Sequence, residues 1–472
     1  MRNSRRVARR YSDLQPALAP HPDYALRITN YEFFIGGVRR LENRYHSVRL
    51  DVSRCRGCTN CLKHCPTEAI RIRDGRAHII DEKCIDCGEC IRICSFHAKV
   101  AVVDPLESIK RFKYAIALPA PTLYGQFRGL KQPELVLEAL KQVGFDDVFE
   151  VARGADVVTK AIRERMKKGD YPTPLISSAC PAVVRLIQVR FPSLLPNVVD
   201  IRQPMEVAAS MARREFCRKH GCAPEDVGCF FITPCPAKMT AIRRPIGQIK
   251  SEMDGAVSVM EMYGLLLPHI KKMQADPDFH LATRYGIAWA SSNGEANAVC
   301  PEDSLSVDGI PNVIRVLEEV ENNKLTDLKY LEGNACMGGC VGGPLTFENN
   351  YVAKNTIQTM AHALPPTHPD EDVPPSALNK YPIRNDRRFE PNDTLKLDDN
   401  IIVAMQKIQR IHELMEKLPG YDCGSCWSPT CETFAEDIVN GQCREMDCIH
   451  LMKAEIQRMA QEMVDLAQTK RE

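Results

Sequence analysis

Residues 55–66 read CRGCTNCLKHCP, and residues 84–94 read CIDCGECIRIC. Each stretch carries three cysteines at intervals of three residues and a fourth cysteine four residues further on. A loop with this spacing wraps three thiolates around one face of a 4Fe–4S cluster, while the fourth thiolate reaches a second cluster. Zinc sites usually use paired C-x2-C knuckles instead. The spacing therefore predicts two 4Fe–4S clusters. The expected ligands are Cys55, Cys58, Cys61 and Cys94 for one, and Cys84, Cys87, Cys90 and Cys65 for the other.

The composition of the whole chain agrees with a redox protein of a reducing compartment. The 472 residues include 21 cysteines and carry a net charge of +1, and this charge argues against a nucleic-acid partner. No run of about 18 apolar residues predicts a membrane span. The basic N-terminus lacks the apolar stretch of a signal peptide. We therefore expect a cytoplasmic protein whose clustered cysteines bind metal rather than form disulfides.

The middle of the chain alternates strand-like and helix-like segments. Strands are predicted at Tyr114–Leu118, 174–178 and Cys229–Thr233, and helices at 133–143 and 204–220. This alternation predicts an α/β domain with an at least partly parallel sheet. Ligand sites in such sheets lie beyond the carboxyl ends of the strands, which is where two cysteines of interest occur.

Three segments of this domain carry cysteines in distinctive surroundings: SSACPA at 177–182, TPCPAK at 233–238 and NACMGGCVGG at 334–343. Four thiolates from three distant segments can form a single 4Fe–4S site. The glycines of the third segment allow the backbone to approach inorganic ligands closely. Lys238 could place an ammonium group beside an anionic cofactor.

These segments resemble the three signature segments of the iron-only (FeFe) hydrogenases, over residues 112–355. The two-cluster module likewise resembles a bacterial ferredoxin domain. The resemblance implies an H-cluster, which is a 4Fe–4S cubane joined to a two-iron subsite carrying CO, CN and a bridging dithiolate. It implies Cys180, Cys235, Cys336 and Cys340 as cubane ligands, with Cys340 bridging to the two-iron subsite and Lys238 hydrogen-bonded to a cyanide; Cys340 and Lys238 are thus the expected catalytic residues. The implied reaction is the reversible conversion of two protons and two electrons into H2, with a ferredoxin-like electron carrier and hydrogenase maturation enzymes as partners.

The chain departs from the family pattern around the implied cofactor. The cysteine that relays protons in the usual enzymes is replaced by Ala179. The other departures are Thr233, Ala241, Asn334, Ile162 and Arg165. Candidate replacements for the proton relay are Glu164, Glu206, Glu295 and ordered water. Because a positioned proton-transfer group is worth about 10²–10⁴ in rate, these departures predict slow turnover. They resemble the branches of the family regarded as sensory, groups C and D, and the short C-terminal region favours group D.

A third cysteine group follows at 418–448, with the spacing C-x2-C-x4-C-x16-C. It resembles the single-cluster 4Fe–4S domain of several anaerobic redox proteins, with Cys423, Cys426, Cys431 and Cys448 as implied ligands. Two helices with heptad-like apolar stripes are expected on either side, at 401–418 and 452–466. The stripes favour ordinary packing, such as one helix on the other, over self-association or a signalling partner. The remaining cysteines, Cys217, Cys222, Cys229, Cys300 and Cys443, are expected to pack rather than to ligate.

Five regions are therefore expected. They are a basic extension at 1–48, a two-cluster ferredoxin domain at 49–105, an H-cluster domain at 112–355, a linker at 356–399 and a C-terminal 4Fe–4S domain at 400–472. The leading hypothesis is a slow, H2-sensing iron-only hydrogenase with three accessory 4Fe–4S clusters. The alternatives are a catalytically silent H2 sensor or electron relay, and an iron–sulfur assembly factor that lacks the two-iron subsite.

Overall fold

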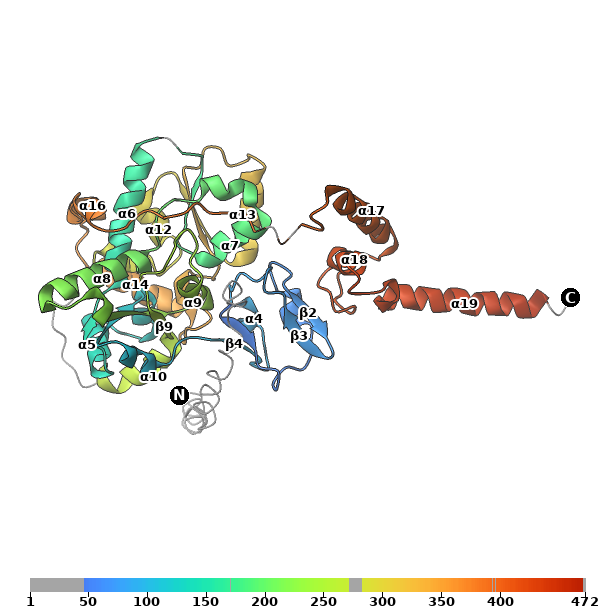
Figure 1. Ribbon diagram of the computed structural model, residues 1–472, viewed down its shortest axis with the longest axis horizontal. Helices are drawn as coiled ribbons and strands as arrows, with labels where there is room; N and C mark the ends of the chain where they lie inside the picture. The colour runs from blue at the N-terminus through green and yellow to red at the C-terminus, as the bar shows by residue number, and fades with distance from the viewer. Residues whose placement is uncertain (1–45, 170, 271–281, 393, 395, 470–472) are drawn as a thin grey trace, which may run out of the picture. The chain divides into compact units, whose positions relative to one another are not determined.

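The structure is a computed structural model that describes residues 46–169, 171–270, 282–392, 394 and 396–469 (Figure 1). The predicted basic extension lies outside the described residues except for 46–48. These three residues are buried, and Val48 opens the first strand. Among the described residues, 46–48 therefore belong to the two-cluster module, which the sequence predicts to begin at residue 49.

The two-cluster module consists of two antiparallel strand pairs and two short helices. Strand β1 (Val48–Leu50) pairs with β4 (Lys99–Ala101), and β2 (Ile70–Arg73) pairs with β3 (Arg76–Ile79). The helices α3 (Asn60–Lys63) and α4 (Glu89–Arg92) each follow a cysteine-rich loop. Because the module has few apolar side chains, its core combines them with the cysteines themselves.

The middle domain contains two parallel sheets, which confirms the predicted α/β class. One sheet has the strand order β6-β5-β8-β9 and the other has the order β10-β11-β7. Their bounds are β5 Tyr114–Pro119, β6 Asp147–Val148, β7 Leu175–Ile176, β8 Val227–Thr233, β9 Gly255–Ser258, β10 Ser304–Asp308 and β11 Tyr330–Asn334. Strands β5, β7 and β8 are the three predicted ones, although β7 has only two residues.

Helices cover both sheets of this domain (Figure 1). Their bounds are α5 Glu134–Gln142, α6 Val151–Lys167, α7 Pro181–Arg190, α8 Pro204–His220, α9 Pro236–Arg243, α10 Val259–Ile270, α11 Arg284–Ala288, α12 Gly294–Val299, α13 Ile310–Glu321 and α14 Asn350–Ala363. Helices α5 and α8 match the predicted ones. The sheets end in loops that carry the three cysteine segments, and these loops form the candidate site.

The predicted linker at 356–399 is only partly a linker. Helix α14 continues through its first eight positions, and the short helices α15 (Pro369–Asp372) and α16 (Ala377–Lys380) follow. Val373, Tyr381 and Ile383 are buried in the core of the middle domain. The sequence did not predict this packing, because the region is rich in proline and its apolar residues are sparse and not periodic.

The C-terminal region contains three helices, α17 (Ile401–Lys417), α18 (Cys431–Val439) and α19 (Ile449–Thr469). Helix α17 packs on α18 through Ile411 and Leu414, which contact Phe434 within one small core. The stripe of α19 is instead exposed along its length, so the expected packing of one striped helix on the other is not what this structure has. None of the described helices is long and apolar enough to cross a membrane.

Candidate iron–sulfur centres

Two of the predicted cubane ligands occupy the same local position, directly before a helix. Cys180 precedes α7 and Cys235 precedes α9, and in both cases a proline fills the first helical position. Proline is preorganised for that position, so the sequence Cys-Pro starts a helix just after the cysteine. The positive end of the helix dipole favours the thiolate form of a cysteine placed there.

The other two predicted ligands lie in the loop after β11. The loop turns tightly at Gly339, which has a φ of +89°. A Cβ on Gly339 would lie 2.4 Å from the amide nitrogen of Ser292. Ser292 N–H in turn donates to the carbonyl of Gly338 at 2.9 Å. A glycine is therefore required for the loop that carries Cys336 and Cys340 to pack against residues 291–292.

The structure brings these four cysteines together. Burial raises the pKa of Cys235 to about 12, and the nearby charges of Cys336 and Cys180 act in the same direction. Burial also raises the pKa of Cys340 well above its ordinary value, and the same three thiols add to the effect. Buried thiols that destabilise one another's ionised form are suited to sharing a metal centre, which neutralises that repulsion. The assignment of the four as ligands remains a prediction.

Lys238 joins the first and second cysteine segments. Its ammonium group donates to the carbonyl of Ala179 at 2.7 Å and to Oε1 of Gln203 at 2.8 Å. Its side chain is buried, so these two bonds hold a positive charge beside the four cysteines. The predicted bond from Lys238 to a cofactor ligand would have to use its remaining proton.

One of the family departures has a visible structural role. The hydroxyl of Thr233 donates to the carbonyl of Cys235 at 2.9 Å and accepts from its amide at 3.3 Å. Thr233 therefore fixes the turn that presents the Cys235 thiol. Ala241 and Ile162 are buried among apolar residues, so neither offers a polar group.

The structure separates the three candidate relay carboxylates. Glu164 pairs with Lys167 on a partly exposed helix face. Glu206 accepts bonds from Ser251 and from the amide of Glu252, both at 2.7 Å. Neither makes a bond to the segment around Ala179 among the described contacts.

Glu295 is bonded to that segment. The hydroxyl of Ser177 donates to its carboxyl oxygens at 2.7 and 2.9 Å, and the amide of Ala179 donates to the Ser177 hydroxyl at 3.1 Å. Tyr330 donates to the same carboxyl at 2.6 Å. Burial, reinforced by repulsion from Glu332, raises the pKa of Glu295 to about 8. A carboxylic acid with this pKa can exchange a proton near neutral pH.

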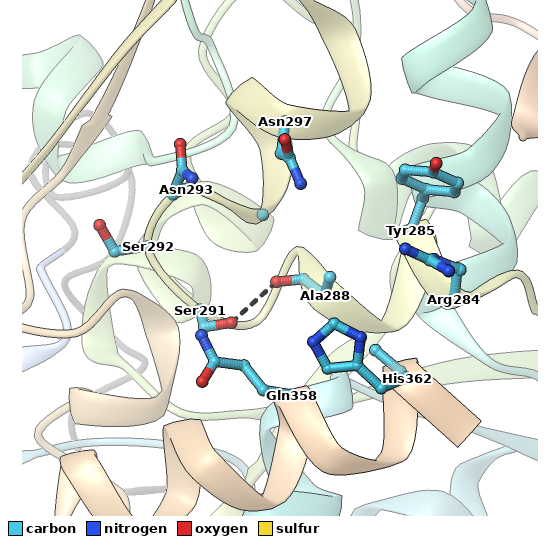
Figure 2. A pocket seen from close by; sticks show the side chains of 11 residues that line it. Arg284, Tyr285, Ala288, Ser291, Ser292, Asn293, Asn297, Gln358 and His362 are labelled. Atoms are coloured by element: carbon cyan, nitrogen blue, oxygen red, sulfur yellow. Dashed lines mark hydrogen bonds between the residues drawn. The ribbon is translucent and has the colours of Figure 1, made fainter. Parts of the chain in front are cut away.

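A line of hydroxyl groups continues from Glu332 toward a surface pocket. Ser306 is hydrogen-bonded to Glu332, and its oxygen lies 3.1 Å from that of Ser292. Ser292 lines a pocket of about 130 Å³ together with Asn293 and His362 (Figure 2). Hydroxyl and carboxyl groups thus extend from the pocket to Glu332, whose charge acts on Glu295.

The cysteines of the two-cluster module act on one another's pKa mostly within the two predicted groups, whose assignment as ligands stays a prediction. Burial raises the pKa of Cys61 to about 11, Lys99 opposes this, and Cys58, Cys94 and Cys55 reinforce it. The other group is Cys65, Cys84, Cys87 and Cys90, whose members influence one another in the same way. Backbone amides point at several of the sulfurs. Among these bonds are Ala69 N–H to Cys65 at 3.2 Å, Ala98 N–H to Cys94 at 3.3 Å and Ala77 N–H to Cys55 at 3.4 Å.

A buried ammonium group beside these cysteines is suited to contact an anionic iron–sulfur cluster. The ammonium of Lys99 is 2% exposed and finds no hydrogen-bond partner among the described residues. It acts electrostatically on cysteines of both groups, Cys61 and Cys90. A buried unpaired cation is costly, and the bridging sulfides of a cluster are acceptors that would satisfy it. The residues present therefore fit two 4Fe–4S clusters.

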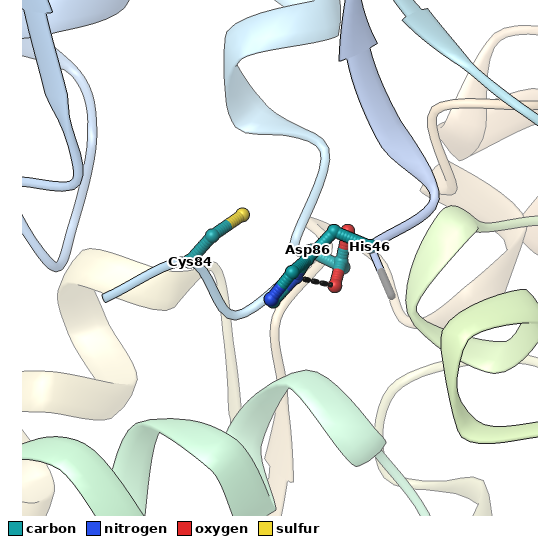
Figure 3. Close-up of side chains that lie close together, drawn as sticks. All are labelled: His46, Cys84 and Asp86. Atoms are coloured by element: carbon teal, nitrogen blue, oxygen red, sulfur yellow. Dashed lines mark hydrogen bonds and ion pairs between the residues drawn. The ribbon is translucent and has the colours of Figure 1, made fainter. Parts of the chain in front are cut away.

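A second group of polar side chains lies at the cysteines of this module (Figure 3). It consists of His46, Cys84 and Asp86. Nδ1 of His46 lies 2.6 Å from Asp86, while its Nε2 has no partner among the described residues. Asp86 also accepts from Val48 N–H at 3.0 Å and lies 3.6 Å from Arg185. Because Asp86 is already engaged by these groups, we interpret His46 and Asp86 as supports of the loop that carries Cys84, not as parts of a separate ion site. Neither His46 nor Lys99 was predicted, because neither belongs to a periodic pattern in the sequence.

Arg92 connects the module to the middle domain. Its guanidinium donates to the carbonyl of Gly342 at 2.7 Å and is hydrogen-bonded to Cys336. At the same junction, a Cβ on Gly88 would lie 2.5 Å from Pro344, so the loop of Cys87 packs directly on the third cysteine segment. The second ferredoxin group is therefore the one nearest the four-cysteine site.

The four predicted C-terminal ligands line a common small pocket, together with His450. They are Cys423, Cys426, Cys431 and Cys448. Burial raises the pKa of Cys426 to about 11, and Cys448 and Cys423 contribute to the rise. Cys443 is absent from the lining and instead accepts a hydrogen bond from Arg73 at 3.3 Å. This geometry agrees with Cys448, rather than Cys443, as the fourth member of the group.

Comparison with known families agrees with this architecture. The family described as "Iron only hydrogenase large subunit, C-terminal domain" matches residues 113–302, a 4Fe-4S dicluster domain matches 47–95, and an Fe-S cluster family matches 418–450. The chain thus carries a match to the large-subunit domain of the iron-only hydrogenases at residues 113–302. This match lies behind a 4Fe–4S dicluster module and ahead of a further Fe-S cluster region.

Individual relatives are distant. The periplasmic [Fe] hydrogenase large subunit of Nitratidesulfovibrio vulgaris is 28% identical over 49% of this chain and 60% of its own length. Iron hydrogenase 1 of Clostridium pasteurianum is 23% identical over 64% of this chain and 65% of its own length. The chain thus spans less than two thirds of these relatives. A cytosolic Fe-S cluster assembly factor, nar1 of Aspergillus flavus, is 26% identical over 34% of this chain and 28% of its own length. Among solved structures, the [FeFe]-hydrogenase HydA1 of Chlamydomonas reinhardtii is similar over 59% of this chain and 90% of its own, with a TM-score of 0.45 and 16% identity.

Proposed function

We propose that this protein is an iron-only hydrogenase that interconverts H2 with protons and electrons slowly, in the manner of an H2 sensor. The observation that carries the proposal is the gathering of Cys180, Cys235, Cys336 and Cys340 from three segments, with the Lys238 ammonium held beside them. When bound, an H-cluster would supply the hydrogen chemistry, with these four thiolates as ligands of its cubane. Three 4Fe–4S clusters in the other cysteine groups would carry the electrons.

The chain's own contribution to this reaction is the movement of protons. Ala179 has no exchangeable side-chain proton, so the usual relay cannot operate. We infer a replacement that runs from the surface pocket through Ser292, Ser306 and Glu332 to the acid Glu295, and from there to the Ser177 hydroxyl. This line contains more steps than a single relay thiol and ends at a hydroxyl, a poor acid. That accounts for slow turnover and suits a sensor, which must report H2 rather than consume it.

Infrared spectroscopy of the matured, anaerobically purified protein tests the proposal. Bands from iron-bound CO and CN are expected only if the two-iron subsite is present. Their absence after co-expression with hydrogenase maturation enzymes would reject the hydrogenase function. Given the bands, assays of H2 uptake and evolution with a one-electron carrier distinguish a slow enzyme from a silent sensor, and rates equal to those of fast hydrogenases would contradict the sensory role.

The similarity to nar1 proteins favours one specific alternative, an iron–sulfur assembly factor that holds a cubane but no two-iron subsite. The infrared test separates this alternative from the hydrogenase function, because a cubane without the two-iron subsite would give no CO or CN bands. The expected cytoplasmic location remains a prediction, and one relative is named as periplasmic.

A further inference from the structure

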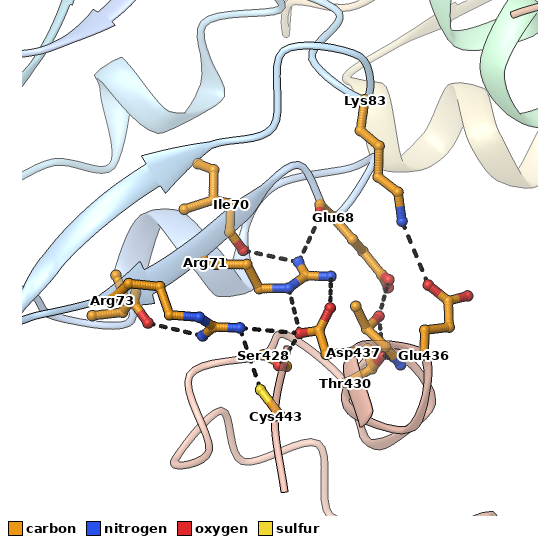
Figure 4. A network of polar contacts seen from close by, with 12 residues as sticks. Glu68, Ile70, Arg71, Arg73, Lys83, Ser428, Thr430, Glu436, Asp437 and Cys443 are labelled. Carbon is orange, nitrogen blue, oxygen red and sulfur yellow. Dashed lines mark hydrogen bonds and ion pairs between the residues drawn. The ribbon is translucent and has the colours of Figure 1, made fainter. Parts of the chain in front are cut away.

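The C-terminal module packs on the β2–β3 hairpin of the two-cluster module through a buried ion pair (Figure 4). Nε and Nη2 of Arg71 donate to the two carboxyl oxygens of Asp437 at 2.6 and 3.1 Å. The hydroxyl of Ser428 donates to the same carboxyl at 2.6 Å. The side chains of Arg71 and Asp437 are only 4% and 6% exposed. Two parallel bonds of this kind fix orientation as well as distance.

Other bonds extend the contact on both sides of this pair. Ile72 N–H donates to the carbonyl of Trp427 at 3.4 Å, and Thr433 donates to Glu68. Lys83 lies 3.5 Å from Glu436. Removing water from an Arg–Asp pair costs several kcal/mol per ion unless the geometry is good and the remaining donors are satisfied. Here Arg71 also donates to the carbonyls of Glu68 and Ile70, so the interface meets that condition.

This interface places the C-terminal cysteine group against the first group of the two-cluster module. A Cβ on Gly424, which follows Cys423, would lie 3.4 Å from Leu62 and 3.7 Å from Lys63. Leu62 directly follows Cys61. A hydrogen bond from Ser425 is the main cause of the lowered pKa of Cys423, and the charge of Lys63 contributes. The loop that follows Cys423 thus packs against the two residues that follow Cys61.

We propose that the C-terminal cluster exchanges single electrons directly with the outer ferredoxin cluster, held by Cys55, Cys58, Cys61 and Cys94, and that the Arg71–Asp437 pair maintains this path. In the forward step a reduced C-terminal [4Fe–4S]⁺ cluster becomes [4Fe–4S]²⁺, and the outer cluster takes the electron and goes from the 2+ to the 1+ state. A reduced ferredoxin-like carrier supplies the electron to the C-terminal cluster. This inference rests on the cluster assignments of the proposed function, and it makes the C-terminal module the electron entry point.

The test uses the full-length, cluster-loaded protein and electron paramagnetic resonance (EPR). In the reduced wild type, the spins of the C-terminal and outer clusters are expected to interact and to split their signals. The variant Asp437→Arg places two guanidinium groups face to face and is expected to abolish this splitting. It is also expected to slow electron transfer from a reduced carrier to the ferredoxin clusters at least tenfold, with iron content unchanged. The exchanged pair R71D/D437R is expected to restore both.

Two controls keep the outcome decisive. Arg410→Glu breaks an exposed ion pair with Glu445 in the same module and should change neither readout. If Asp437→Arg does not fold, Asp437→Asn, which keeps the volume of the side chain but removes the charge that holds Arg71, should fold and still weaken the splitting and slow the transfer. Absence of splitting in the wild type, or an unchanged transfer rate in Asp437→Arg, would overturn the proposal. Missing CO and CN bands would reject the hydrogenase function alone, since the EPR readout does not depend on the two-iron subsite.

Discussion

Replacing Glu295 by glutamine should raise stability at alkaline pH and lower hydrogen turnover. The raised pKa of this buried acid means that the folded protein keeps it neutral, while the unfolded chain ionises it above its ordinary value of 4.5. Its contribution to stability is therefore fully present below pH 4.5 and is lost progressively as the pH rises to about 8. At about 1.36 kcal/mol for each pKa unit, the loss reaches at most about 5 kcal/mol. Glutamine cannot ionise, so Glu295→Gln should gain up to this amount over the wild type at pH 9 and nothing at pH 4.

Hydrogen turnover should fall in Glu295→Gln, because glutamine cannot pass a proton to Ser177. A loss of about 10²–10⁴ is expected for a proton-transfer group. The assays are denaturant unfolding at pH 4, 7 and 9, and hydrogen evolution with a reduced one-electron dye. Glu206→Gln is the matched control, since it is also a buried glutamate with a raised pKa but bonds away from Ala179, and its turnover should stay within about threefold of the wild type. Unchanged turnover in Glu295→Gln would refute the route, and a loss of both turnover and alkaline stability would indicate a structural role.

Three further predictions concern the metal centres. Lys99→Met should lower the midpoint potentials of the ferredoxin clusters, because a buried cation favours the reduced clusters. The expected shift is on the order of 60 mV, which corresponds to a tenfold change in the equilibrium constant for one electron. Unchanged or raised potentials in an EPR-monitored titration would contradict this. Removing the iron with a chelator should destabilise the two-cluster module first, because Lys99 then has no acceptor; proteolysis that begins instead in the middle domain would argue against that order. Lys238→Met should shift the CN infrared bands and lower occupancy of the two-iron subsite while the total 4Fe–4S content stays constant, and identical bands would show that Lys238 makes no contact with the subsite.

Cysteine spacing predicted more of this protein than hydropathy did. Ligands of one cluster must be close in space, so short intervals such as Cys84-x2-Cys87 predict geometry without knowledge of the fold. The grouping of Cys65 with the later triplet follows from the same rule and stays a prediction, and the structure places Cys65 close enough to act on the pKa of Cys84 and of Cys87. The middle strands and helices were found where apolar runs were long, as in β8, and were missed where they were short, as in β9.

The residues that connect the centres could not be predicted. Asp437, Arg92 and Lys99 matter because of the groups that the fold places beside them, and each partner is far away in sequence or is inorganic. Glu295 was one of three candidate carboxylates, and only its bond to Ser177 distinguished it. A polar residue in a helix or strand has the same local pattern whether it is solvated or buried against a partner, so tertiary contacts alone decide its role.

The cysteine groups form a series in which a positive side chain lies at each junction. Lys63 lies between the C-terminal and outer ferredoxin groups, Lys99 between the two ferredoxin groups, and Arg92 between the inner ferredoxin group and Cys336. Reduced clusters are anions, so an electron that moves along the series meets the repulsion of its neighbours, and a cation at each junction offsets that repulsion. The offset depends on burial, because water screens exposed charges. Lys63 is exposed and Lys99 is buried, so the entry step should respond to ionic strength, whereas transfer between the two ferredoxin clusters should not.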